Sequence, residues 1–297
     1  MYTSHQIMEN KNMKNVLETL EEACRAAGKI SLPRQGNVEI AVVKSAGDYA
    51  TTSDIDAGTT MTAIINEQLP DIPIVPEENK TDQVDEQFWA ERQAMLDNGT
   101  FILMDDLDAT VRYRHGGEDW GHILGLVQNN VLTHCAMFMP ARDVMVLAEL
   151  DKGCFVNGTQ VRLNPDLKVQ DSLLCMTVHK DVDLAFHRDV VTPIVYSVGP
   201  GGYVCFNSNI GGVVRLVQGE LGGFIGCGHN WDFVGALAVQ EASGIALSPT
   251  GQELNWNKIP MVMVAAANRQ IANAMLAHTR AYLHYQEHFW GNPKFQS

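Results

Sequence analysis

Three aspartates crowd the end of an apolar segment in FILMDDLDAT, the stretch that spans residues 101–110. The four hydrophobic residues predict a short buried strand, and Asp105, Asp106 and Asp108 follow it directly. Carboxylates this close together repel one another and raise one another's pKa, so the cluster costs stability unless a positive charge lies among them. A solvated acidic loop is one interpretation of this strand end, and a buried metal site is the other.

Short apolar segments alternate with helical patterns in the first half of the chain. The predicted elements there are helices over 6–29, 51–69 and 82–97 and strands over 40–45, 72–76 and 101–104. Asn129-Asn130 separates HILGLVQ from VLTHCAMFM, a spacing typical of a β-hairpin. The segments VMVLAEL and CFVNGTQVRL continue this antiparallel pattern.

The second half alternates apolar strands with helices expected near 182–195, 208–219, 232–243 and 269–288. The chain shows no repeat and no linker rich in Pro, Gly or Ser. We therefore expect an α+β protein with two α/β halves, residues 1–145 and 146–297, packed into one compact unit.

Charge and cysteine content exclude several classes of partner and site. A formal net charge of −14 argues against a nucleic acid polymer or an anionic membrane surface as the main partner. The six cysteines form no CxxC pair, which argues against a zinc knuckle or a thioredoxin-like motif. With a polar N-terminus and no apolar run of membrane-spanning length, we expect a soluble cytoplasmic protein with reduced cysteines.

Acidic residues occur at four places where a predicted strand ends or a helix begins. They are Asp54 in TTSD, the pair Glu77 and Glu78 in PEEN, the aspartates of FILMDDLDAT, and Asp232 in HNWD. Taken singly, Asp54 or Asp232 would cap the helix that follows it, and the glutamate pair would be solvated. Taken together at the edge of a sheet, where α/β folds build sites, they would destabilise the fold without cations. Carboxylates and carbonyls are the ligands of hard divalent cations, so the pattern favours Mg²⁺ and phosphoryl-transfer chemistry.

The order of these motifs resembles that of the inositol monophosphatase family of Mg²⁺-dependent, Li⁺-sensitive sugar phosphatases. TSD, EE, MD-x-LD-x-T, KGCFVNG, WDFVGALAVQEASG and VMVAAAN follow one another between Asp54 and Asn268. The resemblance implies a layered αβαβα sandwich and a homodimer. It also implies Mg²⁺-dependent hydrolysis of a small polyol, sugar or nucleotide phosphate by direct attack of water, without a phosphoenzyme.

Carried over position by position, the resemblance assigns roles to individual residues. The implied ligands of two or three Mg²⁺ ions are Glu77, Asp105, the Leu107 carbonyl, Asp108 and Asp232. Asp54 and Thr110 would orient and deprotonate the attacking water, with Glu78 close by. The backbone N–H groups of Ala109 and Thr110 would receive the phosphate at the start of a short helix.

Two residues depart from the usual family stretch D-P-(I/L)-D-G-T. Asp106 replaces the proline, which removes a fixed φ and adds a negative charge that would either tighten metal binding or repel phosphate. Ala109 replaces the glycine, which is costly at positive φ and harmless in a helix.

The residues expected on the substrate side also differ from the family pattern. Arg112 lies in VRYRH after Thr110, where it would contact a second anionic group or balance nearby carboxylates. Asn209 lies in FNSNIGG, before the helix that contacts the sugar in the family. Ile225 stands near the position where inositol-preferring members have a carboxylate, so we do not expect inositol monophosphate to be the physiological substrate.

These departures support an alternative function, that of a catalytically weak or inactive family member that binds or regulates. Every carboxylate assigned to metal binding or water activation is nevertheless present. The sequence therefore favours the enzyme over the binding protein.

Overall fold

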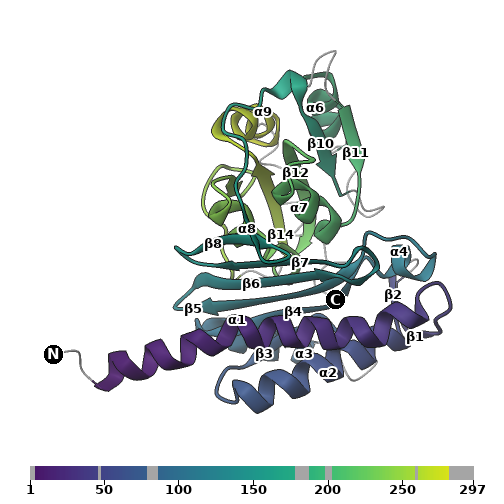
Figure 1. The fold of residues 1–297 in the computed structure, drawn as a ribbon. Coiled ribbons are helices and arrows are strands. Elements are labelled where there is room, and N and C mark those ends of the chain that lie inside the picture. The colour runs from purple at the N-terminus through teal and green to yellow at the C-terminus, as the bar shows by residue number, and fades with distance from the viewer. Residues whose placement is uncertain are drawn as a thin grey trace.

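Helices and sheets stack in five layers in the computed structural model, which describes residues 4–45, 48–78, 86–177, 187–197, 203–257 and 260–280 (Figure 1). Helices α1 and α2 cover the outer face of a seven-stranded sheet, and α7 and α8 lie between this sheet and a five-stranded one. Helices α6 and α9 lie against the far side of the five-stranded sheet (Figure 1). This confirms the α+β fold class and the αβαβα order of layers.

The elements of the first layers follow one another from the N-terminus to Val161. They are α1 (Ser4–Ser31), the 3₁₀ turn η1 (Leu32–Arg34), β1 (Ile40–Ser45), β2 (Asp48–Thr51), α2 (Thr52–Gln68), β3 (Ile74–Pro76), α3 (Glu86–Asp97), β4 (Phe101–Asp108), α4 (Thr110–Arg114), β5 (Gly121–Gln128), β6 (Val131–Met139), the 3₁₀ turn η2 (Pro140–Arg142), β7 (Val144–Glu149), β8 (Gly153–Val156) and β9 (Thr159–Val161). Strands β3 to β9 form the seven-stranded sheet in sequence order, with β3 parallel to β4 and the other pairs antiparallel. The boundary expected near residue 145 falls within β7 of this sheet.

The remaining elements build the second sheet and its helices. They are the 3₁₀ turn η3 (Val169–Asp171), β10 (Leu173–Met176), the π-helical turn η4 (His187–Val191), α6 (Thr192–Ser197), β11 (Tyr203–Phe206), α7 (Asn209–Val217), β12 (Gly223–His229), the 3₁₀ turn η5 (Trp231–Phe233), α8 (Ala236–Glu241), β13 (Ile245–Leu247), β14 (Pro260–Ala266) and α9 (Arg269–Arg280). The strand order is β11-β10-β12-β14-β13, with β10 parallel to both β11 and β12. Within the described ranges, no helix combines the length and the apolar content that crossing a membrane requires.

Strand β4 is buried on both faces, which explains its continuous apolar run. Ile102 and Met104 pack with the buried faces of α1 and α2, whereas Phe101 and Leu103 pack in the core between the two sheets. Because side chains alternate along a strand, the next residue, Asp105, points into the space between the sheets. The hydrophobic pattern of one strand therefore decides which way the first aspartate faces.

The structure differs from the expected elements at several points. Strand β4 continues through the aspartates to Asp108, rather than ending at Met104, because its pairing with β5 continues there. The short strands β2 and β13 were not expected, and the helix predicted over 232–243 is a 3₁₀ turn followed by α8. The expected helices over 82–97, 182–195 and 269–288 extend partly outside the described residues, at 82–85, 182–186 and 281–288.

Candidate active site

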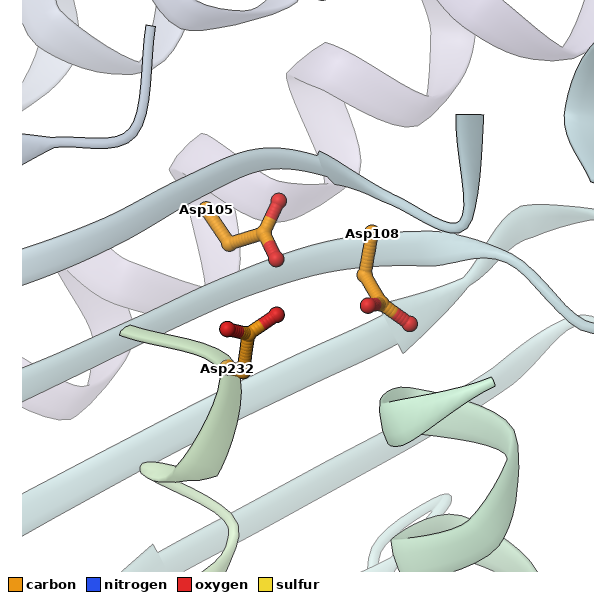
Figure 2. A group of neighbouring side chains, drawn as sticks. All are labelled: Asp105, Asp108 and Asp232. Atoms are coloured by element: carbon orange, nitrogen blue, oxygen red, sulfur yellow. The ribbon is translucent and has the colours of Figure 1, made fainter. Parts of the chain in front are cut away.

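Two aspartates of one strand and a third from far along the chain converge between the two sheets (Figure 2). Asp105 and Asp108 belong to β4, and Asp232 comes from η5 in the second half of the chain. One carboxylate oxygen of each lies within 4.8 Å of the corresponding oxygens of the other two. Asp105 is 1% exposed and Asp108 7%, and the side chain of Asp232 is 12% exposed. We call Asp105, Asp108 and Asp232 the three-aspartate cluster.

An irregularity in β4 places Asp105 and Asp108 on the same side of the sheet. Asp105 pairs with Ile123 and Asp108 with Gly121, so three steps along β4 (105 to 108) oppose two steps along β5 (123 to 121). In a regular strand, residues three apart point to opposite faces, and the extra residue of a β-bulge reverses this. The bulge is therefore what allows both carboxylates to reach Asp232.

Few protein donors satisfy the oxygens of the cluster. Neither carboxylate oxygen of Asp105 accepts a hydrogen bond from a donor of the described residues. Asp108 Oδ2 accepts from the Ile210 N–H at 2.9 Å. Asp232 Oδ1 accepts from the Asn209 side-chain amide at 3.1 Å, and its Oδ2 accepts from the His229 N–H. The most deeply buried carboxylate of the cluster is thus the one without a donor.

Burial and mutual repulsion both act on these carboxyls. Burial raises the pKa of Asp105 well above its ordinary value, and the charges of Glu77, Asp108 and Asp232 raise it further. Burial and the charge of Asp232 likewise raise the pKa of Asp108, against the opposing hydrogen bond from Ile210. A cation among these oxygens would relieve both costs, and buried carboxylate oxygens without donors are ligands that hard divalent cations prefer. The residues present therefore fit a divalent metal ion.

Glu77, one of the predicted metal ligands, lies beside the cluster, close to Asp105. Glu77 follows β3, and its N–H donates to the Met104 carbonyl at 2.8 Å, which extends the pairing of β3 with β4. Its charge raises the pKa of Asp54 as well as those of two cluster carboxyls. The Leu107 carbonyl, also a predicted ligand, lies 3.1 Å from the Thr110 hydroxyl.

Asp54 is the third residue of α2, where it forms a capping box with Thr51. Its Oδ2 accepts from the Thr51 N–H at 2.9 Å and from the Thr51 hydroxyl, and its Oδ1 lies 2.9 Å from the Thr110 hydroxyl. Burial raises the pKa of Asp54 from 3.8 to about 6, although the Thr51 and Thr110 hydrogen bonds oppose this. Asp54 thus caps the helix, as one sequence interpretation expects, and it also accepts a hydrogen bond from the Thr110 hydroxyl.

Ala109 lies at the junction between β4 and α4, with φ 67° and ψ 44°. This is the left-handed region, which residues other than glycine adopt at a cost. The conformation turns the chain so that Thr110, the first residue of α4, brings its hydroxyl toward Asp54. The departure from the family glycine therefore falls at a strained position.

Asp106 points away from the three-aspartate cluster. Its Oδ2 accepts from the Glu78 N–H at 3.0 Å, and its Oδ1 lies against α2, where a Cβ on Gly58 would come within 1.7 Å of it. The carbonyl of Asp106 accepts from the Nδ1 of the buried His122 at 2.6 Å. The additional charge of this chain is therefore directed toward α2 and the backbone after β3 rather than toward the three-aspartate cluster.

The three expected substrate-side residues lie in different surroundings. Asn209 is 3% exposed and donates to the cluster through its contact with Asp232, while its Oδ1 accepts no hydrogen bond among the described residues. Ile225 is 1% exposed in the apolar core of the second sheet and offers no polar group. Arg112 is exposed on α4, and its charge lowers the pKa of Asp108, so it lies near the cluster.

Sequence reasoning missed several residues that support the site. Thr51 is one of them, and its T-x-x-D spacing to Asp54 is a capping-box signal that would have identified it. The backbone donor Ile210 and the buried Arg92 of α3 carry no local signal, because their contacts join segments far apart in the sequence.

Comparison with known proteins places these features in one family. The model of the inositol monophosphatase family matches residues 12–284. SuhB of Neisseria meningitidis serogroup B, a candidate Nus factor, is 23% identical over 91% of this chain and 100% of its own. Inositol monophosphatase 1 of Sus scrofa is 24% identical over 76% of this chain and 81% of its own.

A solved structure supports the fold independently. An IMPase of Thermotoga maritima matches with a TM-score of 0.74 and 18% sequence identity, covering 93% of this chain and 99% of that one. At this identity the likeness bears on the fold alone, and it agrees with the five layers described above.

Proposed function

The chain belongs to the inositol monophosphatase family, and on this premise we propose that it is a Mg²⁺-dependent phosphomonoesterase acting on a small polyol, sugar or nucleotide phosphate. The observation that carries the proposal is the three-aspartate cluster, in which carboxylates of both halves meet within 4.8 Å. Such a cluster is unfavourable in the protein alone and becomes favourable when a divalent cation binds.

Under this proposal each residue of the site has a defined task. Two or three Mg²⁺ ions would be held by Glu77, Asp105, the Leu107 carbonyl, Asp108 and Asp232. When bound, these ions would supply Lewis acidity toward the phosphoryl oxygens and neutralise developing charge. The N–H groups of Ala109 and Thr110 would orient the phosphate for in-line attack by water on phosphorus.

Asp54 and Thr110 would move the proton of the attacking water. Thr110 can accept this proton on its hydroxyl oxygen while it passes its own to Asp54 Oδ1, 2.9 Å away. A carboxylate with a pKa of about 6 is suited to accept a proton near neutral pH. Glu78, adjacent to the metal ligand Glu77, would add negative potential at the same edge.

The substrate side favours an anionic substrate other than inositol monophosphate. Ile225 offers only a methyl-rich surface within the core, so no carboxylate at that position would bind ring hydroxyls. Arg112, exposed beside the cluster, would contact a second anionic group of the substrate.

We also propose that the protein acts as a cytoplasmic homodimer. All six cysteines are free thiols, which supports a reducing compartment.

The test is phosphate release from a panel of inositol phosphates, sugar phosphates, sugar bisphosphates and 3′-phosphoadenylates, with and without Mg²⁺. We expect Mg²⁺-dependent turnover with at least one class. Asp105→Asn should lose both Mg²⁺ binding and turnover, whereas Asp54→Asn should still bind Mg²⁺ and lose about two to four orders of magnitude in rate. Turnover that persists without Mg²⁺, or in Asp105→Asn, would contradict the proposed chemistry.

A regulatory function is the second candidate, and the naming of the Neisseria relative as a candidate Nus factor favours it. A protein of this kind would bind Mg²⁺ and fold normally but release no phosphate from any substrate class. Calorimetric Mg²⁺ binding combined with the same panel separates the two candidates.

A further inference from the structure

The segment that carries Glu77 is held from two sides by buried groups of opposite charge. On one side lies Arg92 of α3, and on the other lies Asp106 of β4, the residue that replaces the family proline. We name Arg92 and Asp106 the charged clamp. Neither is expected to contact a metal ion or a substrate.

Arg92 donates to the two carbonyls at the end of β3. Its Nε lies 3.1 Å from the Pro76 carbonyl, its Nη2 also donates to that carbonyl, and the same Nη2 lies 3.0 Å from the Glu77 carbonyl. The side chain is 4% exposed, and its guanidinium lies 5.9 Å from the ring of Trp231, the neighbour of Asp232. Arg92 therefore contacts both the segment that carries Glu77 and the residue next to Asp232.

Asp106 completes the clamp from the opposite side of the segment. Its carboxylate accepts from the Glu78 N–H, so backbone groups on both sides of the peptide that joins Glu77 to Glu78 are bound. Burial lowers the pKa of Arg92 to about 10, and the charge of Asp106 is the largest of the carboxylate charges that oppose this. Arg92 is thus a cation at neutral pH, and it compensates the negative charge that Asp106 adds.

We propose that Arg92 and Asp106 are positioning residues that fix the backbone around Glu77 and so set the affinity of the site for Mg²⁺. The inference rests on the proposed function only in taking Glu77 as a metal ligand. Groups that orient metal ligands commonly change metal affinity by about 10–100-fold when they are removed.

The sign of the effect distinguishes positioning from simple electrostatics. Removing a cation near a cation site would tighten Mg²⁺ binding if charge alone mattered. Arg92 donates to the Pro76 and Glu77 carbonyls and so holds the backbone on which Glu77 is carried, and we therefore expect the loss of positioning to dominate. Arg92→Gln should therefore weaken Mg²⁺ binding.

The experiment measures Mg²⁺ binding to the full chain by calorimetry, without substrate, for Arg92→Gln, Asp106→Asn and the double variant. We expect each single variant to weaken Mg²⁺ binding by about tenfold or more, and the double variant to lose much less than the product of the two losses. Arg142→Gln is the matched control, because Arg142 forms ion pairs with Asp119 and Glu220 and, among the described residues, contacts no proposed metal ligand. It should bind Mg²⁺ as the parent protein does.

Arg92→Lys keeps the experiment decisive if Arg92→Gln fails to fold. A lysine retains the charge but lacks the planar fork that reaches both carbonyls. The Mg²⁺ affinity of Arg92→Lys should therefore lie between those of the parent and Arg92→Gln. If Arg92→Gln is unfolded, the affinity of Arg92→Lys should still lie below that of the parent. Thermal melts in EDTA establish which variants are folded. Unchanged or tighter Mg²⁺ binding in folded Arg92→Gln or Arg92→Lys would overturn the proposal. Absence of Mg²⁺ binding by the parent would instead refute the proposed function.

Discussion

Ala109 replaces the family glycine at a position where the backbone is left-handed, a conformation that strains a residue with a Cβ. Its φ of 67° lies in a region that costs an L residue roughly 1–2 kcal/mol relative to right-handed conformations. The sequence left open whether alanine is harmless there, and the observed backbone shows that it is not. The strain is located between the last aspartate of β4 and Thr110, where the backbone is expected to meet the phosphate.

Ala109→Gly is therefore expected to raise the free energy of unfolding by up to about 1 kcal/mol, since glycine relieves the strain but adds freedom to the unfolded chain. Denaturant titration measures the change. Ala63→Gly, at an exposed position inside α2, is the matched control and should lower stability by about 1 kcal/mol. A loss of stability in both variants would show that Ala109 is not strained.

Strand β4 is the element that organises the site, because its two faces have different tasks. One face presents Asp105 and, through the bulge, Asp108 to the space between the sheets. The other face presents Asp106 to α2, at the position of Gly58. The close approach of strand and helix there requires a residue without a side chain.

Gly58→Ala tests this contact between β4 and α2. Alanine normally stabilises a helix interior by roughly 0.5–1 kcal/mol relative to glycine. Here the new Cβ would lie 1.7 Å from Asp106 Oδ1, so we expect a net loss of about 1–3 kcal/mol from overpacking. In an Asp106→Ala background the same change should become neutral or stabilising, as measured by denaturant titration. An equal loss in both backgrounds would mean that Asp106 is not the obstacle.

The three-aspartate cluster lies where the two halves of the molecule meet. Asp105 and Asp108 come from the first sheet and Asp232 from a turn of the second half, so a bound cation would hold the halves together. Without it, the cluster opposes their packing whenever the carboxyls are ionised. Under the proposed function, metal binding would therefore be linked to the stability of the fold.

This linkage predicts how the stabilisation by Mg²⁺ depends on pH. The folded-state pKa values of Asp105 and Asp108 are raised, so the contribution of these groups to stability is fully present below their unfolded pKa and is lost as pH rises through the folded values. Protons compete with Mg²⁺ for the same oxygens at low pH. We therefore expect the increase in Tm on adding Mg²⁺ to be larger at about pH 8 than at about pH 5.

Differential scanning calorimetry with and without Mg²⁺ at the two pH values makes this measurement. Asp105→Asn, which removes the most buried carboxylate of the cluster, should show little increase in Tm at either pH. An increase that is the same at both pH values in the parent protein would separate Mg²⁺ binding from the ionisation of these carboxyls.

Most of the element order, the α+β class and the presence of a carboxylate cluster were predictable from sequence patterns alone. Hydrophobic periodicity is a local property, and most helices and strands, including the hairpin at Asn129-Asn130, lie where it predicts. The short strands β2 and β13 escaped prediction because a few residues carry too little periodicity. The carboxylates expected to bind metal were recognisable because a buried acidic cluster demands a cation whatever the details of the fold.

The different surroundings of neighbouring acidic residues, by contrast, arise from the packing of distant segments. Asp105 and Asp106 are adjacent in the sequence, yet one faces the cluster and the other faces Gly58 and the Glu78 N–H. The bulge that brings Asp108 back to the side of Asp105 depends on pairing with β5, and the position of Arg92 depends on how α3 packs against the end of β3. These features arise from register and from contacts between distant segments, which the local sequence does not encode.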